Sequence, residues 1–394
     1  MAWRAFAASR AVVWAAGLAA IAVWGVHAGH RVGFDPAGLT RPFGAIGDLL
    51  VAPAARYDTV WFLSIADGGY DRSDQAAFFP LYPALVRLLG WACGSTLLAA
   101  VVLSCAAFVA ALAVVHRLAE LEAGGDAARW AVWSLAFFPG ALWFSAGYSE
   151  SLFLLVSAGA VLAARQGRWA AAAALGVLAT ATRSAGLVLL VPLGLLWLDG
   201  LRAGRARRAD VGWLVLVPAG LVAYCAVLPL FGLPADAPFS AQETWHRAFA
   251  GPWAGVRDGA VAAWDGARQL LHGSPTPVYF TAAGGDPMEV GRHNLMLFGF
   301  LVLAVPAVVG ALRRLPLAYG AYAAAALLLP LSYPVGPQPL MSLPRFEAVL
   351  FPLFLWLGIV LARGPAWRGR LVLALFALGL AGASALFSTW HWVA

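Results

Sequence analysis

Apolar stretches of about 20 residues recur from one end of this chain to the other, and each can cross the hydrocarbon core of a bilayer as a helix. The clear stretches lie at residues 11–29, 95–116, 127–146, 149–164, 211–231, 293–312, 316–334, 346–362 and 371–391. Hydrophobic residues make up 62% of the 394 residues, whereas a soluble domain is roughly half apolar. The stretches also lack the alternation typical of barrel strands. The sequence therefore predicts an all-α polytopic membrane protein that forms a single integral membrane domain over residues 1–394.

The positions of the arginines indicate how the chain is oriented. No lysine occurs, so all 26 basic residues are arginine. Many of them fall in short connections between apolar stretches: Arg4, Arg10, Arg117, Arg129, Arg165, Arg168, Arg202, Arg205, Arg207, Arg208, Arg313, Arg314, Arg363, Arg368 and Arg370. The positive-inside rule makes these connections cytoplasmic. The net charge of +7 then reflects membrane topology, and nothing in it indicates a nucleic-acid partner.

Two long segments are then predicted on the outer side, a first external loop at residues 30–94 and a second segment at 232–292. Within the first, residues 78–92 are short and begin with FFPLYP, so we expect an interfacial or re-entrant helix there and leave its crossing open. The run 169–199 must cross twice and turn near Arg183. This gives about eleven spans, counting the N-terminal run as a span rather than a signal peptide, and an external C-terminus.

Ionisable and aromatic residues gather in the predicted external segments. They are Asp58, Asp67, Asp71, Glu150, Arg183, Gln242, Trp245, His246, Arg247 and Arg345. An ionisable group within apolar sequence needs a partner or a function. A carboxylate can accept the proton of an acceptor hydroxyl, an arginine can neutralise a departing phosphate, and aromatic rings offer apolar faces to a sugar. The set suits transfer of a sugar from a lipid phosphate.

Ordinary structural roles also account for several of these residues. Asp58 would cap an external helix, and Glu150 would favour a helix N-terminus capped by Ser149. Arg183 would extend to lipid headgroups. Asp67 and Asp71 flank two glycines and would shape a turn, and Trp245 would be one more interfacial anchor among 18 tryptophans.

Six motifs together resemble one known family. In chain order they are YDTVWFLSIADGGY, AFFPLYPALVRLL, FFPGALWFSAGYSESLF, ATATRSAGL, AQETWHR and SLPRFEAVLFPLF. They resemble the PIG-V type mannosyltransferases, polytopic enzymes of the GT-C class that include bacterial relatives. The resemblance covers residues 56 to about 355. It implies a GT-C type fold, a polyprenyl or dolichyl phosphate mannose donor, and an active site on the external or lumenal face.

The resemblance also implies roles for particular residues. It places the catalytic base at Asp58 and a second acidic position at Glu150, and it assigns Arg183 and Arg345 to the donor phosphate. The residues expected to bind substrate are Tyr57, Asp67, Tyr148, Arg183, Gln242, Trp245, Arg247 and Arg345. Two features depart from the family pattern: Tyr57 stands where a tryptophan is usual, and the loop has no Asp-x-Asp pair. The resemblance therefore implies no cofactor firmly, and a divalent metal stays open but unsupported.

The expected reaction is a single inverting displacement at the anomeric carbon, with mannose passing to a glycolipid, polysaccharide or protein acceptor. The alanine- and arginine-rich, lysine-free composition favours a bacterial plasma membrane, with the active site facing outside. A transporter or lipid flippase is the main alternative and predicts functional charges near the bilayer midplane and related halves. A non-catalytic scaffold and a transferase for another prenyl phosphate sugar, such as arabinose, also stay open.

Overall fold

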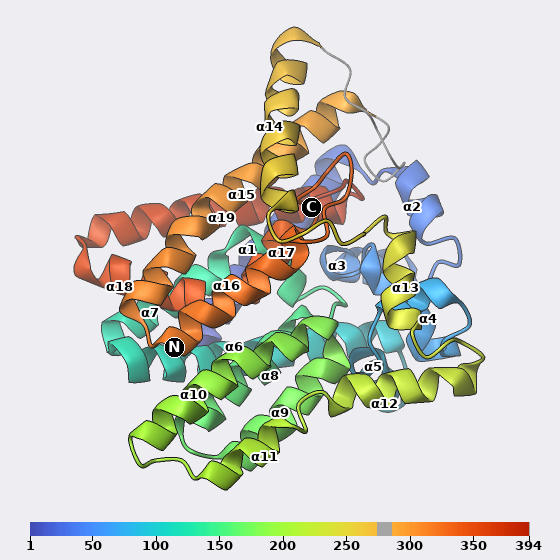
Figure 1. Ribbon diagram of the computed structural model, residues 1–394. Helices are drawn as coiled ribbons and strands as arrows, with labels where there is room; N and C mark the ends of the chain where they lie inside the picture. The colour runs from blue at the N-terminus through green and yellow to red at the C-terminus, as the bar shows by residue number, and fades with distance from the viewer. Residues whose placement is uncertain (274–285, 394) are drawn as a thin grey trace.

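The computed structural model describes residues 1–273 and 286–393, and every regular element in this part of the chain is helical (Figure 1). The α-helices are α1 Ala2–Trp24, α2 Ala28–Phe34, α3 Gly44–Val51, α4 Asp58–Gly68, α5 Leu81–Cys93, α6 Thr96–Ala123, α7 Gly125–Phe137, α8 Glu150–Arg165, α9 Trp169–Thr182, α10 Leu190–Arg202, α11 Val211–Leu214, α12 Ala219–Val227, α13 Ala237–Thr244, α14 Ala254–His272, α15 Pro287–Arg314, α16 Leu317–Leu331, α17 Leu343–Ala348, α18 Phe351–Arg363 and α19 Ala366–Ser388. Short 3₁₀ helices join some of them, including η3 Pro139–Phe144 and η4 Ser184–Leu189.

The predicted membrane architecture is confirmed. Within the described residues, six helical segments are long and apolar enough to cross a bilayer: Ala2–Trp24, Thr96–Ala123, Ser184–Arg202, Arg208–Phe231, Pro287–Arg314 and Ala366–Ser388. Shorter apolar helices lie among them, including Trp169–Thr182, Leu317–Leu331 and Phe351–Arg363. The protein is therefore an all-α integral membrane protein, whereas the number of about eleven spans stays a prediction.

Prolines divide two of the stretches that the sequence predicts as single spans. The stretch 127–146 is helical only to Phe137, because Pro139 cannot continue the α-helix, and η3 follows. The stretch 346–362 is interrupted between α17 and α18, where Pro352 occupies the first turn of α18. The run 169–199 turns where predicted: α9 ends at Thr182 and Arg183 is extended. Each break places polar residues of a motif among the apolar helices.

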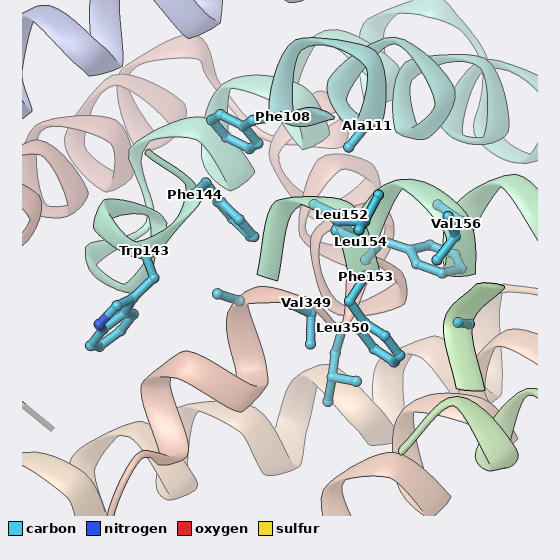
Figure 2. Close-up of a cluster of buried hydrophobic side chains, with 14 of the residues drawn as sticks. Phe108, Ala111, Trp143, Phe144, Leu152, Phe153, Leu154, Val156, Val349 and Leu350 are labelled. Atoms are coloured by element: carbon cyan, nitrogen blue, oxygen red, sulfur yellow. The ribbon is translucent and has the colours of Figure 1, made fainter. Parts of the chain in front are cut away.

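A cluster of buried side chains joins α6, η3, α8 and the α17–α18 connection. The rings of Phe108 and Phe144 stack with their centroids 4.5 Å apart, and Figure 2 shows them facing Leu152 of α8 and Val349 across the same interior. Small residues bring α7 and α18 together, since a side chain at Gly358 would collide with the backbone oxygen of Ala127. Close approach through small residues is typical of membrane helix bundles.

One end of the bundle collects connections that the sequence predicts as cytoplasmic. Arg165, at the end of α8, donates to Glu122 near the end of α6 at 2.5 Å, and the Tyr319 hydroxyl of α16 donates to the same carboxylate at 2.8 Å. For Arg10, the prediction of a cytoplasmic connection is wrong. It lies inside α1, buried, and donates to the Ala141 carbonyl at 2.8 Å and the Ser145 hydroxyl at 2.7 Å. Arg10 therefore binds η3 and does not mark a cytoplasmic connection.

The two long segments predicted on the outer side are partly helical. In the first, α5 packs beside the start of α6. The hydroxyl groups of Tyr82 and Ser104 form a hydrogen bond of 2.7 Å, and Gly90 lies against Thr96. In the second, α14 projects from the bundle together with the first turns of α15 (Figure 1). There a side chain at Gly266 would meet the Gly291 carbonyl oxygen at 2.5 Å. The helix predicted at residues 78–92 is thus present, and its relation to the membrane stays a prediction.

Candidate active site

Asp58 is the first residue of α4, as the sequence predicts, and two contacts fix it there. Its backbone N–H donates to the Tyr148 hydroxyl at 3.1 Å. The preceding Tyr57 has φ 49°, in the left-handed region, which costs an L-residue about 1–3 kcal/mol and is typical of functional sites. The turn after η3 presses against this point, since a side chain at Gly147 would meet Thr59 at 2.6 Å. The sharp turn therefore fixes the start of α4 against Tyr148.

Arg345 of α17 connects the two acidic residues. Its Nη1 donates to Asp58 and its Nε donates to Glu150. The guanidinium also lies over the Tyr148 ring, 4.7 Å from the ring centre. The position of α17 depends on a close contact with η3, because a side chain at Gly140 would meet the Pro344 carbonyl oxygen at 2.5 Å. One arginine thereby holds two carboxylates from distant parts of the chain.

Glu150 lies behind Arg345 and is fully buried. It also accepts a hydrogen bond from Arg183 at 2.5 Å, to the same oxygen that Arg345 contacts. Within the described residues, its other oxygen has no hydrogen-bond partner, and the Ser149 side chain makes no capping bond to α8. Glu150 is therefore the buried counter-charge of two arginines. The interpretation of Glu150 as a residue that only favours a capped helix start does not explain this pairing.

Charges compensate one another in this cluster. Asp58 and Glu150 face Arg183 and Arg345, and a buried charge needs such pairing. Burial alone lowers the pKa of Arg345, but the carboxylates of Glu150 and Asp58 outweigh this effect and raise it above its ordinary value. Burial also raises the pKa of Tyr148 well above its ordinary value. Arg345 is thus charged and Tyr148 neutral at physiological pH.

A third arginine approaches the same helix. Arg183 and Arg247 each lie over the ring of Phe346, at 5.8 and 5.7 Å from its centre. Arg247 also donates to the carbonyl oxygen of Met341 at 3.2 Å. Three arginines predicted from separate motifs, including Arg345, therefore surround α17.

A pocket of about 320 Å³, counting space open to solvent, lies in front of this cluster. The residues that line it are Tyr57, Asp58, Trp143, Tyr148, Ser342, Arg345, Phe387, Trp392 and Val393. Among the described residues, Glu150 and Arg183 are not in this lining. The pocket combines one carboxylate and one guanidinium with aromatic walls, so it can bind a ligand with both anionic and apolar parts.

Other predicted residues lie elsewhere. Asp67 is near the end of α4, about 13 Å along the helix from Asp58 by helical rise, and the Thr96 hydroxyl donates to it at 3.4 Å. Trp245 packs edge-on against Trp61, with ring centroids 5.8 Å apart. Gln242, in α13, is likewise outside the pocket lining among the described residues. The structure therefore does not bring these three to the pocket.

Sequence reasoning missed five of the lining residues: Trp143, Ser342, Phe387, Trp392 and Val393. Four are apolar or aromatic residues at span ends, where anchors are common, so the sequence did not distinguish them. Within residues 1–273 and 286–393, no group of three or more histidine, cysteine or acidic side chains is placed to hold a metal ion.

Comparison with known proteins supports the motif resemblance. The family model described as "Mannosyltransferase (PIG-V)" matches residues 45–198, a segment that contains Asp58, Glu150 and Arg183. Residues 45–198 are thus similar to the PIG-V mannosyltransferase family. A curated protein, GPI mannosyltransferase 2 of Drosophila pseudoobscura pseudoobscura, is 32% identical to this chain over 112 residues. That alignment spans 26% of this chain and 25% of the relative.

A solved structure shows a weaker similarity to this chain. It is the Archaeoglobus fulgidus oligosaccharyltransferase in the apo form, with 14% sequence identity and a TM-score of 0.46. The alignment covers 98% of this chain and 56% of that one. A match at this level carries no conclusion about the fold or the function.

Proposed function

We propose that this protein is a membrane glycosyltransferase that transfers mannose from a polyprenyl phosphate mannose to a hydroxyl group of an acceptor on the external face. One observation carries the proposal: Asp58 and Arg345 are bonded to each other and line the same pocket. A base and a phosphate-binding cation are the two groups that such a transfer requires. The PIG-V family match supports the choice of mannose.

The mechanism is a single displacement with inversion. Asp58 accepts the proton of the acceptor hydroxyl as the oxygen of that hydroxyl bonds to the anomeric carbon. The bond from the anomeric carbon to the phosphate oxygen breaks, and its electron pair leaves with the polyprenyl phosphate. Arg345 stabilises the negative charge that develops on the leaving phosphate. A β-linked donor gives an α-mannoside.

Binding of the donor changes the partners of Arg345. Without substrate, Arg345 neutralises Asp58 and holds it as an ion pair. A donor phosphate competes with Asp58 for the planar guanidinium, and Asp58 is then available to the acceptor hydroxyl. The base therefore becomes available when the donor is in place.

Glu150 has a positioning role in this proposal, in place of a catalytic one. It is fully buried and holds both Arg345 and Arg183, so it fixes the orientation of Arg345 toward the pocket. Arg183 and Arg247, which both contact the ring of Phe346, add positive charge near the donor phosphate. The partners are then a lipid-linked sugar donor, a glycolipid, polysaccharide or protein acceptor, and membrane lipids.

The test follows radiolabelled mannose from synthetic polyprenyl phosphate mannose into lipid and protein fractions of membranes that contain the protein. Asp58→Asn should lose at least about 100-fold in transfer, as expected for a general base, at an unchanged level of protein. Asp71→Asn is the matched control, because Asp71 is an exposed aspartate in the same external loop. Full transfer by Asp58→Asn, or label that crosses the membrane without joining an acceptor, would overturn the proposal.

A further inference from the structure

The segment after α19 folds back onto the pocket. Trp390 adopts φ 64°, which reverses the chain just after α19 ends at Ser388. Three backbone carbonyl oxygens then hold the segment in place. That of Thr389 accepts from the His27 N–H at 2.9 Å, and those of Trp390 and Trp392 lie 2.8 and 3.1 Å from ring nitrogens of His30 and His293. The segment is thus fixed by α2 and α15.

This fold-back gives the pocket an aromatic wall. Trp392 and Val393 line the pocket, and the Trp392 ring meets the Tyr57 ring edge-on with the centroids 5.4 Å apart. Tyr57 is itself held against Trp390, with ring centroids 5.2 Å apart. Trp392 therefore shares the pocket with Asp58, from a part of the chain more than 300 residues away.

A buried arginine stabilises this wall. Arg56 donates to the carbonyl oxygens of Ala55 at 2.7 Å and Ser388 at 3.0 Å. Its guanidinium also lies over Trp390, 5.0 Å from the ring centre. Arg56, which directly precedes the strained Tyr57, thereby connects the start of α4 to the end of α19. The wall is thus held by contacts within the protein itself.

The chemistry of the pocket indicates what this wall contacts. The lining combines aromatic rings with one carboxylate and one guanidinium, so it suits a sugar ring, which carries hydroxyl groups, better than a prenyl chain, which has no polar groups. The apolar C–H face of a pyranose packs on an aromatic ring, while its hydroxyl groups need polar partners. Asp58 and Arg345 supply polar groups in the same pocket lining as Trp392 and Tyr57.

We infer that Trp392, supported by Tyr57, is a specificity-determining residue that packs against the sugar of the lipid donor. This inference rests on the proposed function and deepens it. Trp392 then sets the preference for a sugar-bearing lipid phosphate over the bare lipid phosphate. Arg345 binds the phosphate that both lipids share. Loss of Trp392 therefore weakens binding of the sugar-bearing lipid alone, whereas loss of Arg345 weakens binding of both lipids.

The test compares binding of decaprenyl phosphate mannose with binding of decaprenyl phosphate to the full chain in nanodiscs. Trp392→Ala should weaken binding of the mannosyl lipid about tenfold and change binding of decaprenyl phosphate less than about twofold. Trp392→Phe should keep most of the preference. Trp367→Ala is the control, because Trp367 is 59% exposed at the other end of α19. Arg345→Gln should weaken binding of both lipids.

Different results separate this inference from the proposed function. Wild-type protein that binds neither lipid would overturn the proposed function and the inference with it. Wild-type protein that binds both lipids equally would overturn the inference alone. Wild-type preference for the mannosyl lipid that Trp392→Ala retains would overturn the inference alone. If Trp392→Ala and Trp392→Phe each lose affinity for both lipids equally, the inference is also overturned, because Trp392 would then only support the fold. A rise in acceptor KM without a change in donor binding would place the acceptor at this wall and refute the assignment.

Discussion

Replacement of Glu150 by glutamine tests the charge cluster behind the pocket. Glu150→Gln keeps the shape and one acceptor oxygen but removes the negative charge that faces Arg183 and Arg345. A hydrogen bond to a charged group contributes about 1.5–3 kcal/mol, and Glu150 accepts two of them. Loss of one partner of a buried ion pair costs about 3–5 kcal/mol. Because glutamine keeps an acceptor, we expect a loss near the lower limit, about 3 kcal/mol.

The assay is equilibrium unfolding in mixed detergent micelles, followed by circular dichroism. Glu120→Gln is the matched control, since Glu120 forms an exposed i,i+3 pair with Arg117, and surface pairs contribute less than about 1 kcal/mol. The Glu150→Gln protein should also lose most transferase activity, because Arg345 loses one of the two carboxylates that orient it.

A double-mutant cycle isolates the interaction. Arg183→Met alone should destabilise the protein because it leaves Glu150 with a single partner, whereas Glu150→Gln combined with Arg183→Met should cost less than the sum of the two changes. We expect a coupling energy of about 1–3 kcal/mol. The reasoning fails if Glu150→Gln is as stable as Glu120→Gln, or if the two changes at Glu150 and Arg183 are additive.

Two further substitutions test other contacts. Arg345→Lys keeps the charge but cannot contact Asp58 and Glu150 through a planar fork, so kcat should fall about 100-fold or more while expression is unchanged; near wild-type kcat would contradict the bridging role. Arg10→Met leaves the Ala141 carbonyl oxygen and the Ser145 hydroxyl without their buried donor. The free energy of unfolding should fall by about 2 kcal/mol, and an unchanged value in the same unfolding assay would show that these bonds contribute nothing.

The sequence predicts the membrane architecture well because apolar length is a local property. The same is true of the start of α4 at Asp58 and of the turn at Arg183, which polar residues mark within apolar runs. The meeting of Asp58, Glu150 and Arg345 follows from family motifs and topology and has no local signal. Local patterns fail for Arg10, because a buried arginine that binds backbone carbonyls has the same sequence context as a cytoplasmic one.

The pocket wall could not be predicted for a similar reason. Trp392 follows the last apolar stretch, where tryptophan is common as an interfacial anchor. Its contact with Tyr57 depends on the reversal at Trp390 and on carbonyl contacts to α2 and α15. These are properties of long-range packing. A pattern of residue types along the chain does not predict such packing.

The division of the site between two parts of the chain has a consequence for how it forms. The segment that matches the PIG-V family supplies Asp58, whereas Arg345 and Trp392 come from beyond that segment. Asp58 and Arg345 neutralise each other only when α4 and α17 are both in place. Each would otherwise be an uncompensated charge beside apolar helices, which is strongly unfavourable. The Asp58–Arg345 ion pair is therefore also a contact that joins the two parts of the chain, and the proposed mechanism requires the donor phosphate to loosen this contact.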